Sequence, residues 1–185
     1  MVDDVDGMED VSEVVVRRAG PADLPAIAAI EAVSFPSPWS ETQLAGELRQ
    51  PDATYLVATI NGAVVGFVGI WHVLDEGHIC TLAVAPGWRS HRLGELLVLT
   101  AIERAMELDA TQVYLEYRVG NEPAARLYEK LGFERTGIRR RYYSDTGEDA
   151  VLAQISGLGE PEGRRALERA WERWQRERGL RLVSE

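Results

Sequence analysis

The spacing of apolar and polar residues alternates along the chain between the two-residue period of strands and the longer period of helices. Strands are predicted at residues 14–18, 54–60, 63–73, 78–84, around Glu116, at 134–141 and at 149–154. Helices are predicted at 22–34, from Ser40 to about Arg49, through Leu97, Ala101 and Ala105, and around Tyr128. A capping-box spacing at Ser40 and Gln43 and the hairpin signal Asn61-Gly62 support this order. The order predicts a mixed α/β fold.

One strand and the helix after it carry two groups that can exchange protons. Residues 113–118 alternate apolar with polar side chains, which places Glu116 on the less apolar face of the strand. Asn121 then stands at an N-cap position, and Gly132 ends the following helix, which carries Tyr128. Proton-handling groups on adjacent elements indicate an active site. A solvated strand carboxylate and a packed helix tyrosine are the alternatives that involve no catalysis.

A second segment, residues 82–97, combines a short apolar strand, a Pro-Gly turn, a basic loop and the start of a helix. The loop contains Arg89, His91 and Arg92. The first turn of a helix leaves backbone N–H groups without intrahelical partners and carries the positive end of the helix dipole. The segment therefore predicts an anion site, most simply for phosphate, with an exposed basic turn that binds nothing as the alternative.

Together these two segments resemble the GNAT superfamily of acetyl-coenzyme A-dependent N-acetyltransferases, whose pyrophosphate loop reads Gln/Arg-x-x-Gly-x-Gly/Ala. Arg89 and Gly94 match the first and last positions of that pattern. Arg92 departs from it, because it stands where the family usually has its first glycine. We interpret Arg92 as adding positive charge toward the phosphates beside Arg89 and His91, rather than crowding them.

Further segments extend the resemblance to bacterial ribosomal-protein-alanine N-acetyltransferases, over roughly residues 14–156. They are residues 35–41, the Leu-Glu-x-Arg motif at 115–118, and residues 127–133, 139–143 and 147–150. This resemblance implies a mostly antiparallel central sheet flanked by helices. It also implies transfer of acetyl from acetyl-coenzyme A to a protein N-terminus, expected to be the N-terminal alanine of a ribosomal protein.

The resemblance also implies roles for individual residues. Glu116 would accept the proton of the attacking amine, directly or through water, and Tyr128 would donate one to the departing thiolate. Cofactor-binding residues would be Leu82, Ala83, Val84, Arg89, Ser90, His91, Arg92, Leu93, Gly94, Glu95 and Asn121. Residues that wall the acceptor channel would be Trp39, Tyr142 and Tyr143, each of which has packing as its alternative role.

Composition indicates one domain with tails. A chain of 185 residues with 45% hydrophobic content can bury one core of ordinary size. The net charge of −10 is concentrated in residues 1–13, which hold six acidic residues before the first basic residue, Arg17. We expect residues 1–13 to be a disordered acidic tail, 14–156 the acetyltransferase domain and 157–185 a helical extension. The acidic balance argues against a nucleic-acid partner.

Cysteine usage and hydropathy predict the compartment. Cys80 is the single cysteine, which excludes an intramolecular disulfide. The sequence shows neither a basic-plus-apolar leader nor an apolar stretch of about 18 residues, so we expect a cytoplasmic protein with no membrane attachment. Cys80 is interpreted as a packed thiol, and His72 and His78 as structural histidines. No residue is assigned to a metal.

The C-terminal region contains an apolar stripe within a highly charged helix. Leu167, Ala170, Trp171 and Trp174 fall at helical spacing. The stripe either packs on this protein's own surface or contacts a partner or a second copy of the chain.

Two other functions compete with the favoured one. A GNAT enzyme could act on another amine, such as a lysine side chain or a small metabolite. The chain could also be a non-catalytic acyl-coenzyme A sensor in which Arg92 has abolished turnover; the presence of both Glu116 and Tyr128 argues against this.

Overall fold

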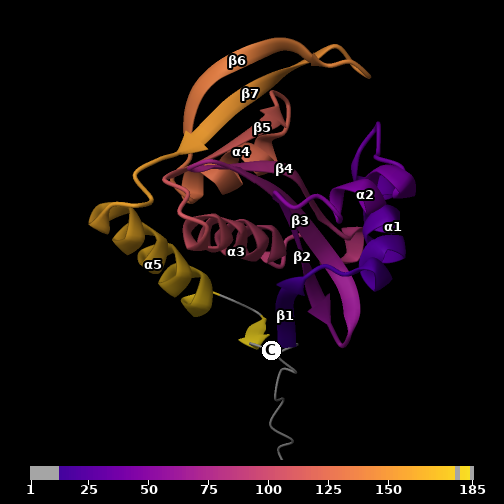
Figure 1. Ribbon diagram of the computed structural model, residues 1–185, viewed down its shortest axis with the longest axis horizontal. Helices are drawn as coiled ribbons and strands as arrows, with labels where there is room; N and C mark the ends of the chain where they lie inside the picture. Colours follow the sequence, from indigo (N-terminus) through magenta and orange to yellow (C-terminus); the bar gives the residue numbers. More distant parts are fainter. Residues whose placement is uncertain (1–12, 178–179, 184–185) are drawn as a thin grey trace, which may run out of the picture.

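The computed structural model describes residues 13–177 and 180–183, and its strands form one sheet in the order β6-β7-β5-β4-β3-β2-β1-β8 (Figure 1). The strands are β1 (Glu13–Arg18), β2 (Ala53–Ile60), β3 (Ala63–Val73), β4 (Glu76–Val84), β5 (Gln112–Arg118), β6 (Glu134–Tyr143), β7 (Glu148–Ile155) and β8 (Arg181–Val183). The helices are α1 (Leu24–Ser34), α2 (Glu41–Glu47), α3 (Leu93–Glu107), α4 (Glu122–Lys130) and α5 (Pro161–Arg176), with single 3₁₀ turns at Pro21–Asp23 and Pro86–Trp88. Of the predicted acidic tail, Glu13 begins β1, and the remainder lies outside the described residues.

Helices cover both faces of the sheet (Figure 1). β2 needs cover on both of its faces, because every residue of this strand is buried. Tyr55 and Val57 face a cluster built with α1 and α2, whereas Leu56 and Ala58 face a larger cluster built with α3, α4 and α5. A strand that is apolar on both faces is expected in the middle of a three-layer arrangement.

The sheet opens at its centre. Neighbouring strands pair antiparallel except for β4–β5 and β1–β8, which are parallel. The β4–β5 ladder joins Glu76–Ile79 to Gln112–Leu115 and ends there, although β4 continues to Val84 and β5 to Arg118. The C-terminal parts of these two strands therefore separate and leave strand edges available to a ligand. The predicted mixed α/β fold with a mostly antiparallel sheet and flanking helices is confirmed.

Two local predictions are confirmed, and some predicted boundaries were wrong. The capping box at the start of α2 and the two-residue turn between β2 and β3 are both present. However, α2 ends at Glu47, and β6 runs on to Tyr143. β4 begins at Glu76 rather than His78, because Glu76 and Gly77 complete the hairpin ladder with β3. Glutamate and glycine are uncommon in strands, so the pattern alone did not include them.

The C-terminal extension packs on the protein itself. α5 lies beside α3, with Ala170 and Trp174 buried against the larger cluster (Figure 1). Of the two alternatives for the tryptophan stripe, the intramolecular one is observed. β8, which the pattern did not predict, then pairs parallel with β1 at the edge of the sheet. Within the described residues, none of the helices has the length and apolar character needed to cross a membrane.

Candidate active site

A cavity of about 470 Å³ lies where β4 and β5 separate. Its walls come from the loop after α1, from β4 and β5, from the start of α4 and from the turn between β6 and β7. It brings together residues that are distant in the sequence. Of the predicted site residues, those lining the cavity are Trp39, Leu82, Glu116, Asn121, Tyr128, Tyr142 and Tyr143.

Glu116 points from β5 into this cavity and forms a short contact with a histidine. Its Oε2 lies 2.6 Å from Nε2 of His78, and its Oε1 lies 3.6 Å from Nη1 of Arg139. The hydrogen bond from His78 lowers the pKa of the Glu116 carboxyl, burial partly opposes this, and the charge of Arg139 adds to the lowering. Glu116 is therefore ionised at neutral pH.

His78 was not among the predicted site residues. It pairs with Tyr114 in the parallel β4–β5 ladder, so Glu116, two residues further along β5, is its diagonal neighbour on the same face. The contact between His78 and Glu116 depends on the parallel register of β4 and β5. The hydrophobic pattern of the sequence does not specify that register.

Tyr128 is held rigidly on α4. Asn121 caps that helix by accepting a hydrogen bond from the N–H of Ala124 at 3.1 Å. The Tyr128 ring packs against the rings of Tyr117 and Phe133, with centroid separations of 5.5 and 5.6 Å. Burial raises the pKa of the Tyr128 phenol well above its usual value, so this side chain stays protonated at any physiological pH.

The two tyrosines of the β6–β7 hairpin stand at the mouth of the cavity. The β6–β7 ladder is irregular between Arg139 and Tyr143, which redirects the side chains at the end of β6. The guanidinium of Arg118 lies 3.9 Å from the ring centre of Tyr143 and forms an ion pair with Asp145 at 2.7 Å. Tyr142 packs edge-on against Tyr143 and remains 41% exposed. The hairpin is thus tied to β5 beside Glu116.

Glu31 is a further lining residue that the sequence analysis missed. This carboxylate on α1 is 3% exposed, accepts a hydrogen bond from the N–H of Trp39 at 3.1 Å and receives a longer one from the hydroxyl of Thr81. Burial raises the pKa of Glu31. The sequence could have indicated its burial, because Glu31 lies on the same helical face as the apolar residues Ile27 and Ile30. Glu31 fixes the loop that presents Trp39.

Cys80 lies in a β-bulge on the β4 side of the cavity. The ladder with β3 passes from Gly69↔Thr81 to Ile70↔Ile79 and so skips Cys80. The Cys80 thiol is half-buried and donates a hydrogen bond to the carbonyl of Gly69 at 3.3 Å. Burial raises the pKa of Cys80 to about 12, so the reactive thiolate is scarce at neutral pH.

The predicted phosphate loop, residues 89–92, forms a tight turn before α3. Ser90 and Arg92 both adopt left-handed backbone conformations, with φ of 66° and 60°. Arg89 donates to the carbonyl of Val84 at 3.1 Å, while His91 is exposed. The side chain of Leu93 enters the core. The turn therefore presents mainly its backbone and the N-terminus of α3 to a ligand.

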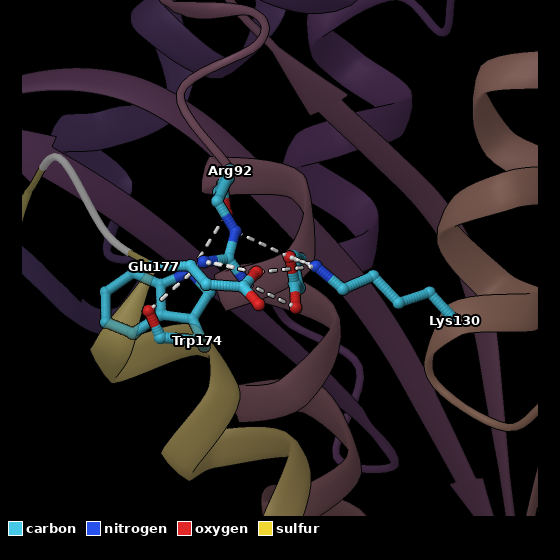
Figure 2. Close-up of polar contacts among 5 residues, drawn as sticks. Arg92, Lys130, Trp174 and Glu177 are labelled. Carbon is cyan, nitrogen blue, oxygen red and sulfur yellow. Dashed lines mark hydrogen bonds and ion pairs between the residues drawn. The ribbon is translucent and has the colours of Figure 1, made fainter.

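Arg92 does not direct its charge toward this turn, which corrects our interpretation from the sequence. Its Nε and Nη2 donate to both carboxylate oxygens of Glu95, at 2.9 and 2.8 Å. Nη1 contacts the carbonyl of Trp174 and the carboxylate of Glu177 on the C-terminal segment (Figure 2). The buried carboxylate of Glu95 attracts the guanidinium more strongly than an exposed loop does. The remaining cofactor candidates are Ala83 and Val84, at the end of β4, and Gly94, in the first turn of α3.

Comparison with known proteins places this geometry in a family. Residues 24–133 match the model of the acetyltransferase (GNAT) family. A relative from Bacillus subtilis, provisionally named as a ribosomal protein bS18-alanine N-acetyltransferase, is 40% identical over 146 residues, which are 78% of this chain and 97% of the relative. The ribosomal protein bS18-alanine N-acetyltransferase of Escherichia coli is 35% identical over 135 residues, which are 72% of this chain and 90% of that protein.

Solved structures agree. The crystal structure of the Escherichia coli ribosomal-protein-S18-alanine N-acetyltransferase matches with a TM-score of 0.72 and 32% identity, covering 78% of this chain and 94% of that one. Ard1 from Thermoplasma volcanium matches with a TM-score of 0.73 and 26% identity, covering 78% and 98%. The chain therefore belongs to the acetyltransferase (GNAT) family, the acyltransferases that use acetyl-coenzyme A as their acyl donor.

Proposed function

We propose that this protein transfers acetyl from acetyl-coenzyme A to the N-terminal α-amine of a protein, specifically the N-terminal alanine of a ribosomal protein. The observation that carries the proposal is the convergence of Glu116 and Tyr128, from β5 and α4, on one cavity at the opening of the sheet. The names of the relatives with 35% and 40% identity support the choice of acceptor. Ribosomes are cytoplasmic, and so is the proposed site of action.

The cofactor would lie along the opened edge of β4. Leu82, Ala83 and Val84 belong to the part of β4 that has left the β5 ladder, so those of their backbone groups that do not pair with β3 would bind the amides of the pantetheine arm. The arm would lead to the turn at residues 89–95, where the backbone N–H groups and the dipole of α3 bind the pyrophosphate. Asn121, at the start of α4, would contact the cofactor from the other side.

The acceptor must lose a proton before it attacks the thioester. An α-amine with a pKa of about 7.7–8.0 is partly protonated at neutral pH. Glu116 is ionised and can accept the proton through water, but its lowered pKa makes it a weak base. The proton therefore passes onward to solvent. His78, in direct contact with Glu116, holds the carboxylate in place and extends that path.

Attack of the neutral amine forms a tetrahedral intermediate, which collapses with loss of the coenzyme A thiolate. A main-chain N–H in the bulged part of β4 around Cys80 would stabilise the oxyanion. Tyr128, which is neutral, would donate its phenolic proton to the departing sulfur, the acylated nitrogen would release its extra proton to Glu116 or water, and solvent would return a proton to the phenolate. No acyl-enzyme is required, because the amine attacks the thioester directly, and burial keeps the Cys80 thiol protonated and so a poor nucleophile.

The walls of the cavity suit an N-terminus with a small first side chain. Trp39 and the pair Tyr142–Tyr143 flank the space in front of Glu116. Glu116 and Asp145 also line this cavity but are already paired with His78 and Arg118, so the aromatic side chains set the size of the first residue. A bulky first residue would have to displace the aromatic side chains.

A competition between peptides tests this proposal. A peptide that begins with Ala and continues as the N-terminus of ribosomal protein bS18 should be acetylated far faster than the same peptide with a blocked N-terminus and an internal Lys. Acetylation is located by mass spectrometry. Faster reaction of the internal-lysine peptide, or of a small polyamine, would replace the proposal with acetylation of another amine.

The pH dependence of kcat/KM should reflect deprotonation of the acceptor α-amine rather than titration of Glu116 or Tyr128. Glu116 stays ionised and Tyr128 stays protonated between about pH 6.5 and 8.5, because the pKa of each is shifted away from this window. We therefore expect kcat/KM to rise across this range as the α-amine deprotonates and then to level off. Initial rates at saturating acetyl-coenzyme A measure it. A fall in rate between pH 7 and 8.5, or a rise that continues toward the lysine pKa of about 10.4, would contradict this account.

A further inference from the structure

The turn that precedes α3 contains a backbone conformation that its sequence does not favour. Arg92 has a φ of 60° and a ψ of 16°, in the left-handed region. A residue with a Cβ is strained there, whereas glycine is not. Contacts made by Arg92 outside the turn would offset this strain.

The C-terminal segment supplies those restraints. Trp174 of α5 donates its indole N–H to the carbonyl of Arg92 at 3.2 Å, and the guanidinium of Arg92 donates to the carbonyl of Trp174 at 3.3 Å. The same guanidinium pairs with Glu177 at 3.2 Å. Figure 2 shows both residues of the C-terminal segment converging on Arg92. Trp174 is fully buried, so its contacts with Arg92 belong to the core, whereas Glu177 lies at the surface with 57% of its side chain exposed.

Arg92 is fixed from within the domain as well. Glu95, 5% exposed on the first turn of α3, accepts two hydrogen bonds from the Arg92 guanidinium and one from Lys130 of α4. Lys130 also reaches Glu177 at 3.5 Å. Two cations and two carboxylates therefore close a neutral cluster beneath the turn (Figure 2). The three guanidinium nitrogens of Arg92 thus contact Glu95, Glu177 and the carbonyl of Trp174.

We propose that Arg92 is a positioning residue through which the C-terminal segment shapes the coenzyme A-binding turn. The anchor from Trp174 and Glu177 keeps residue 92 left-handed, and this conformation aims the backbone N–H groups at the start of α3 toward the pyrophosphate. A family loop with glycine at this position needs no such support. Trp174 and Glu177 thus stabilise in this chain a backbone conformation that glycine adopts without support. The inference rests on the proposed use of that turn for the cofactor.

Two substitutions at one position separate this role from a direct phosphate contact. Arg92→Ala removes the side-chain contacts with Trp174, Glu177 and Glu95 but keeps the Cβ and the main-chain bond from Trp174, whereas Arg92→Gly removes the same contacts and the strain together. We expect the affinity for coenzyme A to fall about tenfold in Arg92→Ala and to be largely rescued in Arg92→Gly. Calorimetry with coenzyme A measures both. KM for acetyl-coenzyme A should rise in Arg92→Ala while kcat changes little.

Trp174→Phe gives an independent test from the other end of the contact. It keeps an aromatic ring in the core and removes the donor to the Arg92 carbonyl. The affinity for coenzyme A should fall in the same direction as in Arg92→Ala. Arg104→Ala, which breaks an exposed ion pair with Glu107 on the same helix, is the matched control and should bind as the wild type does.

The outcomes are distinct. Equal loss of affinity in Arg92→Ala and Arg92→Gly, with a weaker salt dependence, would show that the guanidinium binds phosphate and would overturn the inference. Unchanged affinity in every variant, with only a lower melting temperature, would reduce the cluster to a stabilising contact and overturn it as well. Failure of the wild-type protein to bind coenzyme A would instead contradict the proposed function. Binding by the wild type without peptide acetylation would contradict the proposed acceptor alone.

Discussion

Replacement of Tyr128 by Phe is expected to lower kcat by about 10²-fold, the effect typical of losing a positioned proton donor. The phenyl ring retains the contacts with Tyr117 and Phe133, so α4 and the cavity wall should be preserved. The affinity for acetyl-coenzyme A should change much less than kcat, because the phenolic proton matters only when the thiolate leaves. Steady-state kinetics on an alanine peptide measure the two quantities separately.

A substitution on the exposed side of the same helix is the control for Tyr128→Phe. Glu129→Gln removes an exposed ion pair with Arg135 and should leave kcat unchanged. If Tyr128→Phe turns over at a near-normal rate, Tyr128 is a packing residue and another group protonates the thiolate.

Replacement of Glu116 by Gln is expected to reduce kcat by a similar factor, about 10²-fold. The amide keeps the shape of the side chain and its place beside His78, but it cannot accept a proton from the acceptor amine. Part of the loss should be recovered at higher pH, where the amine deprotonates without help. The ratio of mutant to wild-type kcat, measured from pH 7 to 9, reports this recovery.

Tyr114→Phe provides the comparison on β5, two residues before Glu116 on the same face of the strand. It should behave as the wild type does. A Glu116→Gln enzyme with normal kcat at pH 7 would show that the acceptor reaches the cavity already neutral and that Glu116 serves only to pair with His78.

The sequence was most informative where the chemistry is local. Alternation along residues 113–118 set the face of Glu116, and the N-cap at Asn121 set the start of the helix that carries Tyr128. Both residues reach the same cavity because β5 and α4 are consecutive elements joined by a short loop. A local period and a helix cap are sufficient for that prediction.

The contacts that adjust the site come from pairs distant in the sequence. His78 meets Glu116 across a parallel ladder, and Arg92 meets Trp174 across the interface of α3 and α5. No periodicity within one segment encodes such pairs. Charge alone suggested that Arg92 serves the phosphates, but a buried carboxylate three residues later, at Glu95, attracts its guanidinium instead. Burial of Glu95 became visible only with the fold.

The central claim, acetylation of a ribosomal protein at its N-terminal alanine, is tested most directly in cells. Ribosomal proteins from cells with and without the gene are compared by mass spectrometry of their intact N-termini. We predict that one small-subunit protein beginning with alanine loses its N-terminal acetyl group when the gene is absent. Expression of the wild type should restore that group, and expression of the Tyr128→Phe variant should restore much less of it. Unchanged acetylation of every ribosomal N-terminus, or loss of acetyl groups only from lysine side chains or small amines, would contradict the account.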